Sequence, residues 1–346
     1  MRFLCLGAGA IGTYFGVSLQ CSGQDVVYLE RPEAAEKIRA NGQIVVRIDG
    51  QVLRVEHPVV LESAAELAFQ EPFDAAILAV KSFDTAELIH QLIPMKQNIP
   101  PILCLQNGVE NEPLISNLLG SDRVIAGTVT TAIGKSRNGS IQVERLRGMG
   151  VSDGHPMSAA LVTILDQAGL RAALLGNAQS MKWSKMFTNL VANASSAIFE
   201  MTPAEIFADR SAFLLEMNQL RETLQVMAAS GIPVMDLPGT PVRLLAFAIR
   251  SLPNWLSQLL LVQSVGKARG GKMPSFYIDF HSGRGKTEVD YLNGAVVRQA
   301  EKVGVKVPVN YLLNLTLQGL TEGKFKSEDY RRNPLQLIRK LDEPLR

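Results

Sequence analysis

Short apolar segments alternate with stretches of helical periodicity through the first half of the chain. The apolar segments are Arg2–Leu6, Asp25–Leu29, Ile44–Ile48, Val52–Val55, Ala75–Val80, Ile102–Leu105, Val124–Thr131 and Ile141–Glu144, and helices are expected near Leu61–Phe69 and Met157–Gln167. Ala75–Val80 and Ile102–Leu105 are uninterrupted, as in strands of a parallel sheet that is buried on both faces. The pattern therefore predicts an α/β domain.

The alternation stops near residue 179, and mostly helical patterns follow. They cover residues 181–199, 211–230 and about 241–264, and a last helix begins near Asn310. Thr287 and Asp290 resemble a capping box that opens another helix. The sequence thus predicts an α/β domain over residues 1–178, an all-α domain over 179–330 and a charged tail over 331–346.

A polar stripe runs along the helix predicted for residues 181–199. At about 3.6 residues per turn, Lys185, Asn189 and Asn193 recur at i, i+4 and i+8, and Ser196 falls near the same line. Asn inside a helix costs roughly half a kcal/mol or more relative to Ala, and the neighbours here are apolar. We interpret the stripe as a candidate active site, with a purely structural role as the alternative.

A glycine motif follows the first apolar segment directly and opens a helical stretch. Its residues are Gly7, Ala8, Gly9, Ala10, Ile11 and Gly12. In a G-x-G-x-x-G turn the first glycine permits the turn, the second lets a pyrophosphate approach the backbone, and the third allows close packing of helix on strand. The helix N-terminus then offers free N–H groups to the phosphates. The motif predicts dinucleotide binding.

The second predicted strand ends in Glu30 and Arg31, about twenty residues past the glycines, where such folds select their cofactor. An acidic residue there would hold the ribose 2′-hydroxyl of NAD, whereas an arginine would pair with the 2′-phosphate of NADP. Because Arg31 begins the loop while Glu30 can point away from the ligand, the sequence favours NADP (NADPH). NADH remains the alternative.

Polar residues follow two of the buried strands. Lys81 comes directly after Ala75–Val80, and Asn107 follows Ile102–Leu105. Ligands of open α/β sheets bind outside the carboxyl ends of the strands, so both side chains are expected at the cofactor site.

Composition excludes several other functions. The 35 basic and 33 acidic residues give a formal charge of +2 without a basic block, so no nucleic acid is expected. Three separate cysteines predict buried thiols in a cytoplasmic protein, and four scattered histidines predict no metal site. The apolar segment Leu244–Val262 is interrupted by Arg250, Pro253 and Asn254, which predicts a helical hairpin and no membrane span. Such a hairpin could form a contact between the two copies of a homodimer.

The ordered motifs resemble the ketopantoate reductase (2-dehydropantoate 2-reductase) family. They are Gly7–Gly12, Val80–Asp84, Leu105–Val109, Gly127–Thr131, Trp183–Lys185 with Asn189 and Asn193, Pro274–Ser275 and Thr287–Gly294. The resemblance implies a Rossmann-type N-terminal domain and an all-α C-terminal domain of the 6-phosphogluconate dehydrogenase type. It also implies NADPH-dependent reduction of ketopantoate to pantoate in pantothenate biosynthesis.

The resemblance also implies roles for single residues. Lys185 would be the proton donor, and the substrate would be held by Asn189, Asn193 and Ser275. The cofactor and the cleft beside it would be contacted by Lys81, Asn107 and Glu288, and the 2′-phosphate would be contacted by Arg31.

Two matters stay open. The long segment between Gly231 and Pro274 leaves the substrate undecided, so a β-hydroxyacid or opine dehydrogenase is the first alternative, and an NADP-binding protein without catalysis is the second. The oligomeric state is not readable from the sequence.

Overall fold

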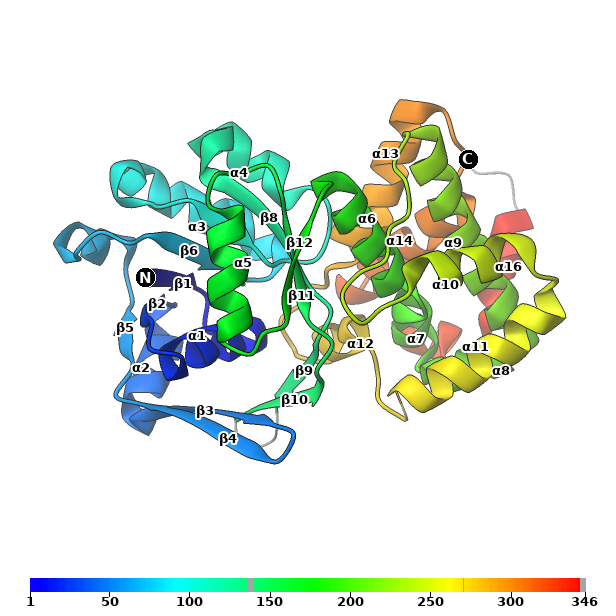
Figure 1. The fold of residues 1–346 in the computed structure, drawn as a ribbon. Coiled ribbons are helices and arrows are strands. Elements are labelled where there is room, and N and C mark those ends of the chain that lie inside the picture. The colour runs from blue at the N-terminus through cyan, green and yellow to red at the C-terminus, as the bar shows by residue number, and fades with distance from the viewer. Residues whose placement is uncertain (136–139, 270, 343–346) are drawn as a thin grey trace. The chain divides into compact units, whose positions relative to one another are not determined.

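The structure is a computed structural model that describes residues 1–135, 140–269 and 271–342. The chain forms two compact units (Figure 1). Unit 1 comprises Met1–Lys182 with Asp236–Thr240, and unit 2 comprises Trp183–Met235 with Pro241–Arg346. Helix α6 (Ala178–Leu190) begins in unit 1 and ends in unit 2, so the chain passes from one unit to the other within a helix.

Unit 1 is built on an eight-stranded sheet. In spatial order its strands are β12 (Ala172–Leu175), β11 (Met149–Ser152), β8 (Val124–Val129), β7 (Ile102–Cys104), β6 (Ala75–Leu78), β1 (Arg2–Leu6), β2 (Asp25–Leu29) and β5 (Val59–Leu61). Neighbouring strands are parallel except for β8 and β11, which are antiparallel. The glycine motif leaves β1, which lies between β2 and β6.

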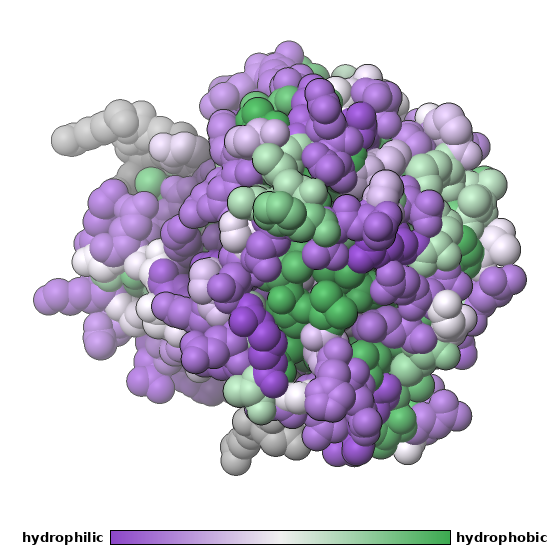
Figure 2. Space-filling model, turned by 90° about the vertical axis from the view of Figure 1, so that its left-hand side faces the viewer, coloured by the Kyte–Doolittle hydropathy of each residue, from purple (hydrophilic) through white to green (hydrophobic). Residues whose placement is uncertain are grey.

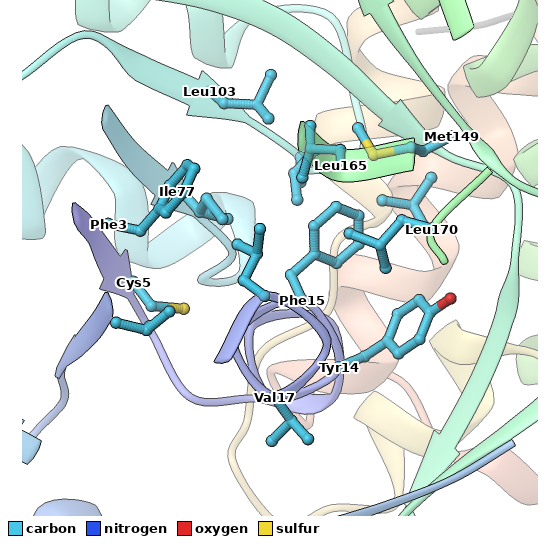
Figure 3. Packing of buried hydrophobic residues seen from close by; sticks show 14 of the residues in the cluster. Phe3, Cys5, Tyr14, Phe15, Val17, Ile77, Leu103, Met149, Leu165 and Leu170 are labelled. Atoms are coloured by element: carbon cyan, nitrogen blue, oxygen red, sulfur yellow. The ribbon is translucent and has the colours of Figure 1, made fainter. Parts of the chain in front are cut away.

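Helices cover both faces of this sheet, as the uninterrupted apolar strands predicted. One face packs against α1 (Ala10–Cys21), α2 (Pro32–Asn41) and α5 (Ser158–Gln167), and the other against α3 (Thr85–Leu92) and α4 (Asn111–Leu119). Successive residues of β1 alternate between the two cores, with Phe3 and Cys5 in the first and Leu4 and Leu6 in the second. Figure 3 shows Phe15 of α1 among side chains of the first core.

A smaller sheet in unit 1 has four strands. In spatial order they are β4 (Gln51–Glu56), β3 (Gln43–Ile48), β10 (Ile141–Arg145) and β9 (Ala132–Lys135). The apolar runs at Ile44–Ile48 and Val52–Val55 are therefore strands, as predicted. The helix expected at Leu61–Phe69 is shorter, because Leu61 ends β5 and a 3₁₀ helix covers only Ala64–Phe69.

Every regular element that the structure describes in unit 2 is helical. Besides the end of α6 they are α7 (Asn193–Phe199), α8 (Pro203–Ala208), α9 (Arg210–Ala229), α10 (Val242–Ser251), α11 (Asn254–Arg269), α12 (Ser275–Phe280), a π-helical turn at Asp290–Gly294, α13 (Ala295–Val303), α14 (Pro308–Thr321), α15 (Ser327–Tyr330) and α16 (Pro334–Asp342). This confirms the predicted fold class.

Three details of the sequence-based prediction change. The apolar segment Leu244–Val262 forms α10 and α11, and α11 runs beyond the predicted segment to Arg269. Residues of the predicted charged tail form α16, whose Leu337 is fully buried. Cys5 and Cys104 are buried, but Cys21 at the end of α1 is exposed, so the prediction of three buried thiols is wrong for one of them.

The surface carries apolar as well as polar residues. Figure 2 shows one face on which hydrophobic residues gather near the centre, surrounded by hydrophilic ones. Among the helices that the structure describes, none combines the length and the apolar character that a transmembrane span requires.

Candidate functional site

The glycine turn after β1 needs two of its glycines for packing. Gly7 has φ +96°, and a Cβ atom on it would lie 2.7 Å from Val80 Cγ1. A Cβ on Gly12 would lie 1.9 Å from the Gly7 carbonyl oxygen and 3.2 Å from Cys5 Sγ. A side chain at Gly12 would displace the backbone of the turn, and one at Gly7 would clash with Val80 and hold a positive φ that favours glycine, so the fold itself requires these glycines.

Gly9 is different because packing does not require it. It is the N-cap of α1 in an extended conformation, and the nearest atom to a Cβ built there is the Ala79 carbonyl oxygen at 4.0 Å. No side chain caps α1, so its first turn presents N–H groups and the positive end of a twelve-residue helix. Open space above a bare helix N-terminus fits the close approach of a pyrophosphate. The residues present therefore suit a dinucleotide.

A pocket of about 800 Å³ lies beside the end of β2 in unit 1. Its lining combines apolar residues, such as Leu29, Val80 and Leu88, with Glu30 and Arg31. Arg31 is the N-cap of α2, its side chain is 69% exposed, and its Nη2 lies 2.8 Å from Asp84 Oδ2. The pocket thus contains both residues at which the sequence predicted cofactor selection.

The prediction that Glu30 points away from the ligand is wrong. The Ala8 N–H of the glycine turn donates to Glu30 Oε2 at 2.6 Å, and the Arg31 N–H donates to Oε1 at 3.1 Å. The reason is the alternation of β2, because Tyr28 lies in the core that α1 covers and Leu29 in the other, so the next residue, whose N–H still pairs with the Leu61 carbonyl at 3.0 Å, falls on the side of α1. The carboxylate is therefore held against the glycine turn and does not point away from it.

Lys81 and Asn107 follow β6 and β7, which are parallel neighbours, so the structure brings their segments together. Ser82 Oγ donates to the Asn107 carbonyl at 3.0 Å, and Asn111 Nδ2 donates to the same carbonyl at 2.8 Å. Gln106 Nε2 donates to the Val80 carbonyl at 3.0 Å. Sequence reasoning missed Ser82, Gln106 and Asn111, although buried polar residues directly after apolar strands are a signal for such a network.

Lys182 is a second lysine that the sequence reading passed over. It lies one helical turn before Lys185 on α6 and is only 4% exposed. Its ammonium lies 2.7 Å from Glu112 Oε1 and donates to the Gln106 carbonyl at 2.7 Å. A buried lysine with these partners has a structural role, whereas Lys185 is partly exposed.

The predicted helix 181–199 is two helices. We call residues Val191–Ala192 the α6–α7 junction, where Ala192 has φ +51°. The Ala192 N–H donates to Glu216 Oε2 at 2.8 Å, and Ser195 Oγ donates to the other oxygen of that carboxylate. The fully buried Glu216 thus binds both sides of the break. Lys185 and Asn189 share α6, but Asn193 begins α7, so the continuous i, i+8 stripe is wrong.

Asn193 nevertheless reaches another predicted site residue. Its Nδ2 donates to Ser275 Oγ at 3.2 Å and to the Asn189 carbonyl at 3.0 Å, while its Oδ1 accepts the Phe276 N–H at 3.0 Å. The first turn of α12 is thereby tied to α7 across 82 sequence positions. Ser196 is buried within α7.

Glu288 is 2% exposed and precedes the π-helical turn at Asp290–Gly294. The capping box expected from Thr287 and Asp290 is wrong, because the N-cap residue is Val289 and no side chain caps this turn. The Asp290 carboxylate instead accepts from Arg298 Nη1 at 3.0 Å. In the described part of the chain, no three His, Cys, Asp or Glu side chains are grouped as metal ligands would be.

Two family models match the chain. Residues 3–153 match "Ketopantoate reductase PanE/ApbA", and residues 177–320 match "Ketopantoate reductase PanE/ApbA C terminal". The chain is similar to the 2-dehydropantoate 2-reductases of Lactococcus lactis, with 25% identity over 89% of this chain and 94% of that protein, and of Archaeoglobus fulgidus, with 25% identity over 93% and 98%.

Solved structures share the fold. A PanE/ApbA family ketopantoate reductase from Ralstonia eutropha has a TM-score of 0.77 at 23% identity and covers 94% of this chain and 99% of its own. A D-mandelate dehydrogenase, solved with NADH and anilino(oxo)acetate, has a TM-score of 0.76 at 22% identity and covers 93% and 99%.

Proposed function

We propose that this chain, which belongs to the ketopantoate reductase family and is an oxidoreductase, reduces ketopantoate to pantoate for pantothenate biosynthesis. The cofactor is a nicotinamide dinucleotide. The family resemblance favours NADPH. The contact between Asn193 and Ser275 carries the proposal, because it joins two residues that the family pattern assigns to the substrate.

A reduced nicotinamide dinucleotide, when bound, would supply the hydride for the ketone carbon of the substrate. In our proposal the first turn of α1, with Gly7, Gly9 and Gly12, receives the pyrophosphate, and the pocket at Glu30 and Arg31 receives the adenosine end. Lys81 and Asn107, at the carboxyl ends of β6 and β7, complete the cofactor side.

Lys185 is proposed as the proton donor. Negative charge develops on the ketone oxygen during hydride transfer, and a preorganised positive group stabilises it. A lysine ammonium is charged at neutral pH and can supply both that field and the proton. The partly exposed position of Lys185 on α6, compared with the buried Lys182, supports this choice between the two lysines.

Asn189 and Ser275 are proposed to bind the substrate, with Asn193 holding Ser275 in place. The Asn193 amide donates to Ser275 Oγ and to the Asn189 carbonyl. It therefore links the two residues that would contact the carboxylate and hydroxyl groups of a 2-oxo acid. Glu288 is proposed to orient the Lys185 ammonium and to contact the cofactor.

Consumption of the reduced cofactor, followed by absorbance with a panel of 2-oxo acids, tests the proposal. We expect ketopantoate to give a kcat/KM at least about tenfold above the others, because a site built to hydrogen-bond a hydroxyl discriminates against acids that lack it. Cofactor binding without reduction of any acid would contradict it.

A second candidate is the reduction of an aromatic 2-oxo acid. The structural likeness to a D-mandelate dehydrogenase favours it, and the panel should therefore include phenyl-substituted acids. A preference for these over ketopantoate would replace the first proposal by the second.

A further inference from the structure

We infer that the pocket beside β2 is built for a ribose with a free 2′-hydroxyl, so that NADH is the preferred cofactor, with Glu30 and Asp84 as the residues that determine this specificity. The inference deepens the proposed function and rests on it, because it assumes that the glycine turn binds a dinucleotide. It departs from the NADPH that the sequence favoured, and the position of Glu30 is the reason.

The Glu30 carboxylate is fixed where the sugar next to the pyrophosphate must lie. Its Oε2 accepts the Ala8 N–H at 2.6 Å, and Ala8 belongs to the turn that would carry the pyrophosphate. An ionised carboxylate only accepts hydrogen bonds, and it has lone pairs beyond the two used by Ala8 and Arg31. A ribose 2′-hydroxyl can donate to it, whereas a 2′-phosphate presents only negative oxygens and is repelled.

Arg31, which would favour a phosphate, is already paired. Its Nη2 lies 2.8 Å from Asp84 Oδ2, and that carboxylate is only 15% exposed while the arginine side chain is 69% exposed. A phosphate would have to compete with Asp84 for the guanidinium and would itself lie near the Asp84 charge. The ion pair therefore lowers the affinity that Arg31 alone would give to NADPH.

The remaining charges of the pocket act in the same direction. Its lining also contains Glu33, Glu62 and Glu87. Glu62 is paired with Arg39, and Glu33 lies in the first turn of α2, where it offsets the positive end of that helix. Carboxylates thus outnumber arginines around the space that a 2′-phosphate would enter, and its charge of about −2 would meet a negative field.

Binding of NADH and NADPH to the full chain, measured by calorimetric titration without any 2-oxo acid, tests the inference independently of turnover. We expect a Kd for NADH at least about tenfold below that for NADPH. Equal or tighter binding of NADPH would overturn the preference while leaving the dinucleotide site intact. Binding of neither cofactor would overturn the proposed function, and this inference with it.

Two variants test the residues themselves. Glu30→Gln should weaken NADH binding by about tenfold and change NADPH binding less, because the amide removes the negative acceptor. Asp84→Asn should strengthen NADPH binding by about fivefold or more, because it frees Arg31. If Glu30→Gln fails to fold, Asp84→Asn still tests whether the charges of the pocket set the preference for NADH over NADPH. An unchanged ratio of the two Kd values in either folded variant would overturn its assignment.

Glu36→Gln is the matched control. Glu36 lies on α2, is exposed and does not line the pocket, so the same change of charge should leave both Kd values within about twofold. A shift in the control as large as that in Glu30→Gln would attribute the effect to net charge and overturn the specific role of Glu30.

Discussion

The glycine turn of unit 1 and the α6–α7 junction of unit 2 achieve the same end by opposite means. Both hold backbone N–H groups and site residues in fixed positions. In the turn, close packing around Gly7 and Gly12 fixes the backbone, because it leaves no room for a Cβ atom at either position. At the junction, a buried side chain fixes the backbone, because the Glu216 carboxylate accepts hydrogen bonds from Ala192 N and Ser195 Oγ.

The difference determines how each region fails. The turn is damaged when an atom is added at Gly7 or Gly12, because neighbouring atoms fill the space there. The junction is damaged when a polar group is removed, because buried donors then lack partners. The predictions below test this contrast, from the largest expected effect to the smallest.

Lys185→Ala should lower kcat by about 10²–10⁴-fold, the range that a positioned general acid contributes. The dinucleotide Kd should stay within about twofold, since the deleted group is proposed to act on the substrate. Steady-state kinetics and cofactor titration measure the two quantities. Lys306→Ala, an exposed lysine of unit 2, is the control and should keep full activity. Near-normal turnover of the Lys185 variant would rule out its role as proton donor.

Gly12→Ala should lower the free energy of unfolding by more than about 3 kcal/mol, because the added Cβ must displace the Gly7 carbonyl oxygen. Urea denaturation measures this change. Gly176→Ala is the matched control, since no atom lies within 4 Å of a Cβ built there. A stability change in Gly12→Ala no larger than in Gly176→Ala would show that the turn relaxes easily.

Glu216→Ala should lower the free energy of unfolding by about 2–3 kcal/mol, because Ala192 N and Ser195 Oγ would lose their buried acceptor. It should also raise KM for the 2-oxo acid more than it lowers kcat, since Asn193 follows the junction directly. Urea denaturation and steady-state kinetics give both values. Glu301→Ala, an exposed glutamate of α13, should change neither. A destabilised variant with an unchanged KM would restrict Glu216 to a role in stability.

Gly9→Ala should weaken dinucleotide binding by about tenfold or more while changing the free energy of unfolding by less than about 1 kcal/mol. The protein itself has room for the methyl group, so only a bound pyrophosphate would meet it. Calorimetric titration and urea denaturation separate the two effects. Unchanged affinity would place the pyrophosphate elsewhere.

Burial raises the pKa of Glu222 above its ordinary value, although the N–H groups of Val309 and Asn310 donate to the carboxylate. The folded state therefore binds this proton more readily than the unfolded state does, so the contribution of Glu222 to stability falls as the pH rises above the ordinary value of 4.5. In Glu222→Gln this dependence should be absent.

Urea denaturation at about pH 5 and about pH 7 tests the sign, because the stability advantage of the natural residue over Gln should be smaller at the higher pH. Glu205 should show the opposite pH dependence, because hydrogen bonds from Thr202 lower the pKa of its carboxyl group. Its contribution should be lost as the pH falls. An advantage of Glu222 that grows with pH would contradict the effect of burial.

The glycine turn could be predicted from the sequence because it depends on local spacing. The distances between Gly7, Gly9 and Gly12 along the chain already determine the turn, and the apolar runs of β6 and β7 bring together the segments that carry Lys81 and Asn107. These features need no information about distant residues.

The rest of the candidate site could not be predicted because it depends on contacts between distant residues. Ala192 adopts a left-handed conformation that its sequence does not favour, and a carboxylate 24 positions away holds it there. The orientation of Glu30 likewise depends on the Ala8 N–H, 22 positions earlier. Lys182 and Lys185 have the same chemistry, and only burial separates them.

The different environments of the three cysteines make thiol chemistry selective in this protein. Burial raises the pKa of the Cys5 thiol, beside the glycine turn, and of the Cys104 thiol at the end of β7, so the reactive thiolate is disfavoured at both. Cys21 is exposed at the end of the helix that the turn begins. A maleimide dye will therefore couple at Cys21 in the folded protein, and attachment at the two inner thiols will report unfolding of the sheet.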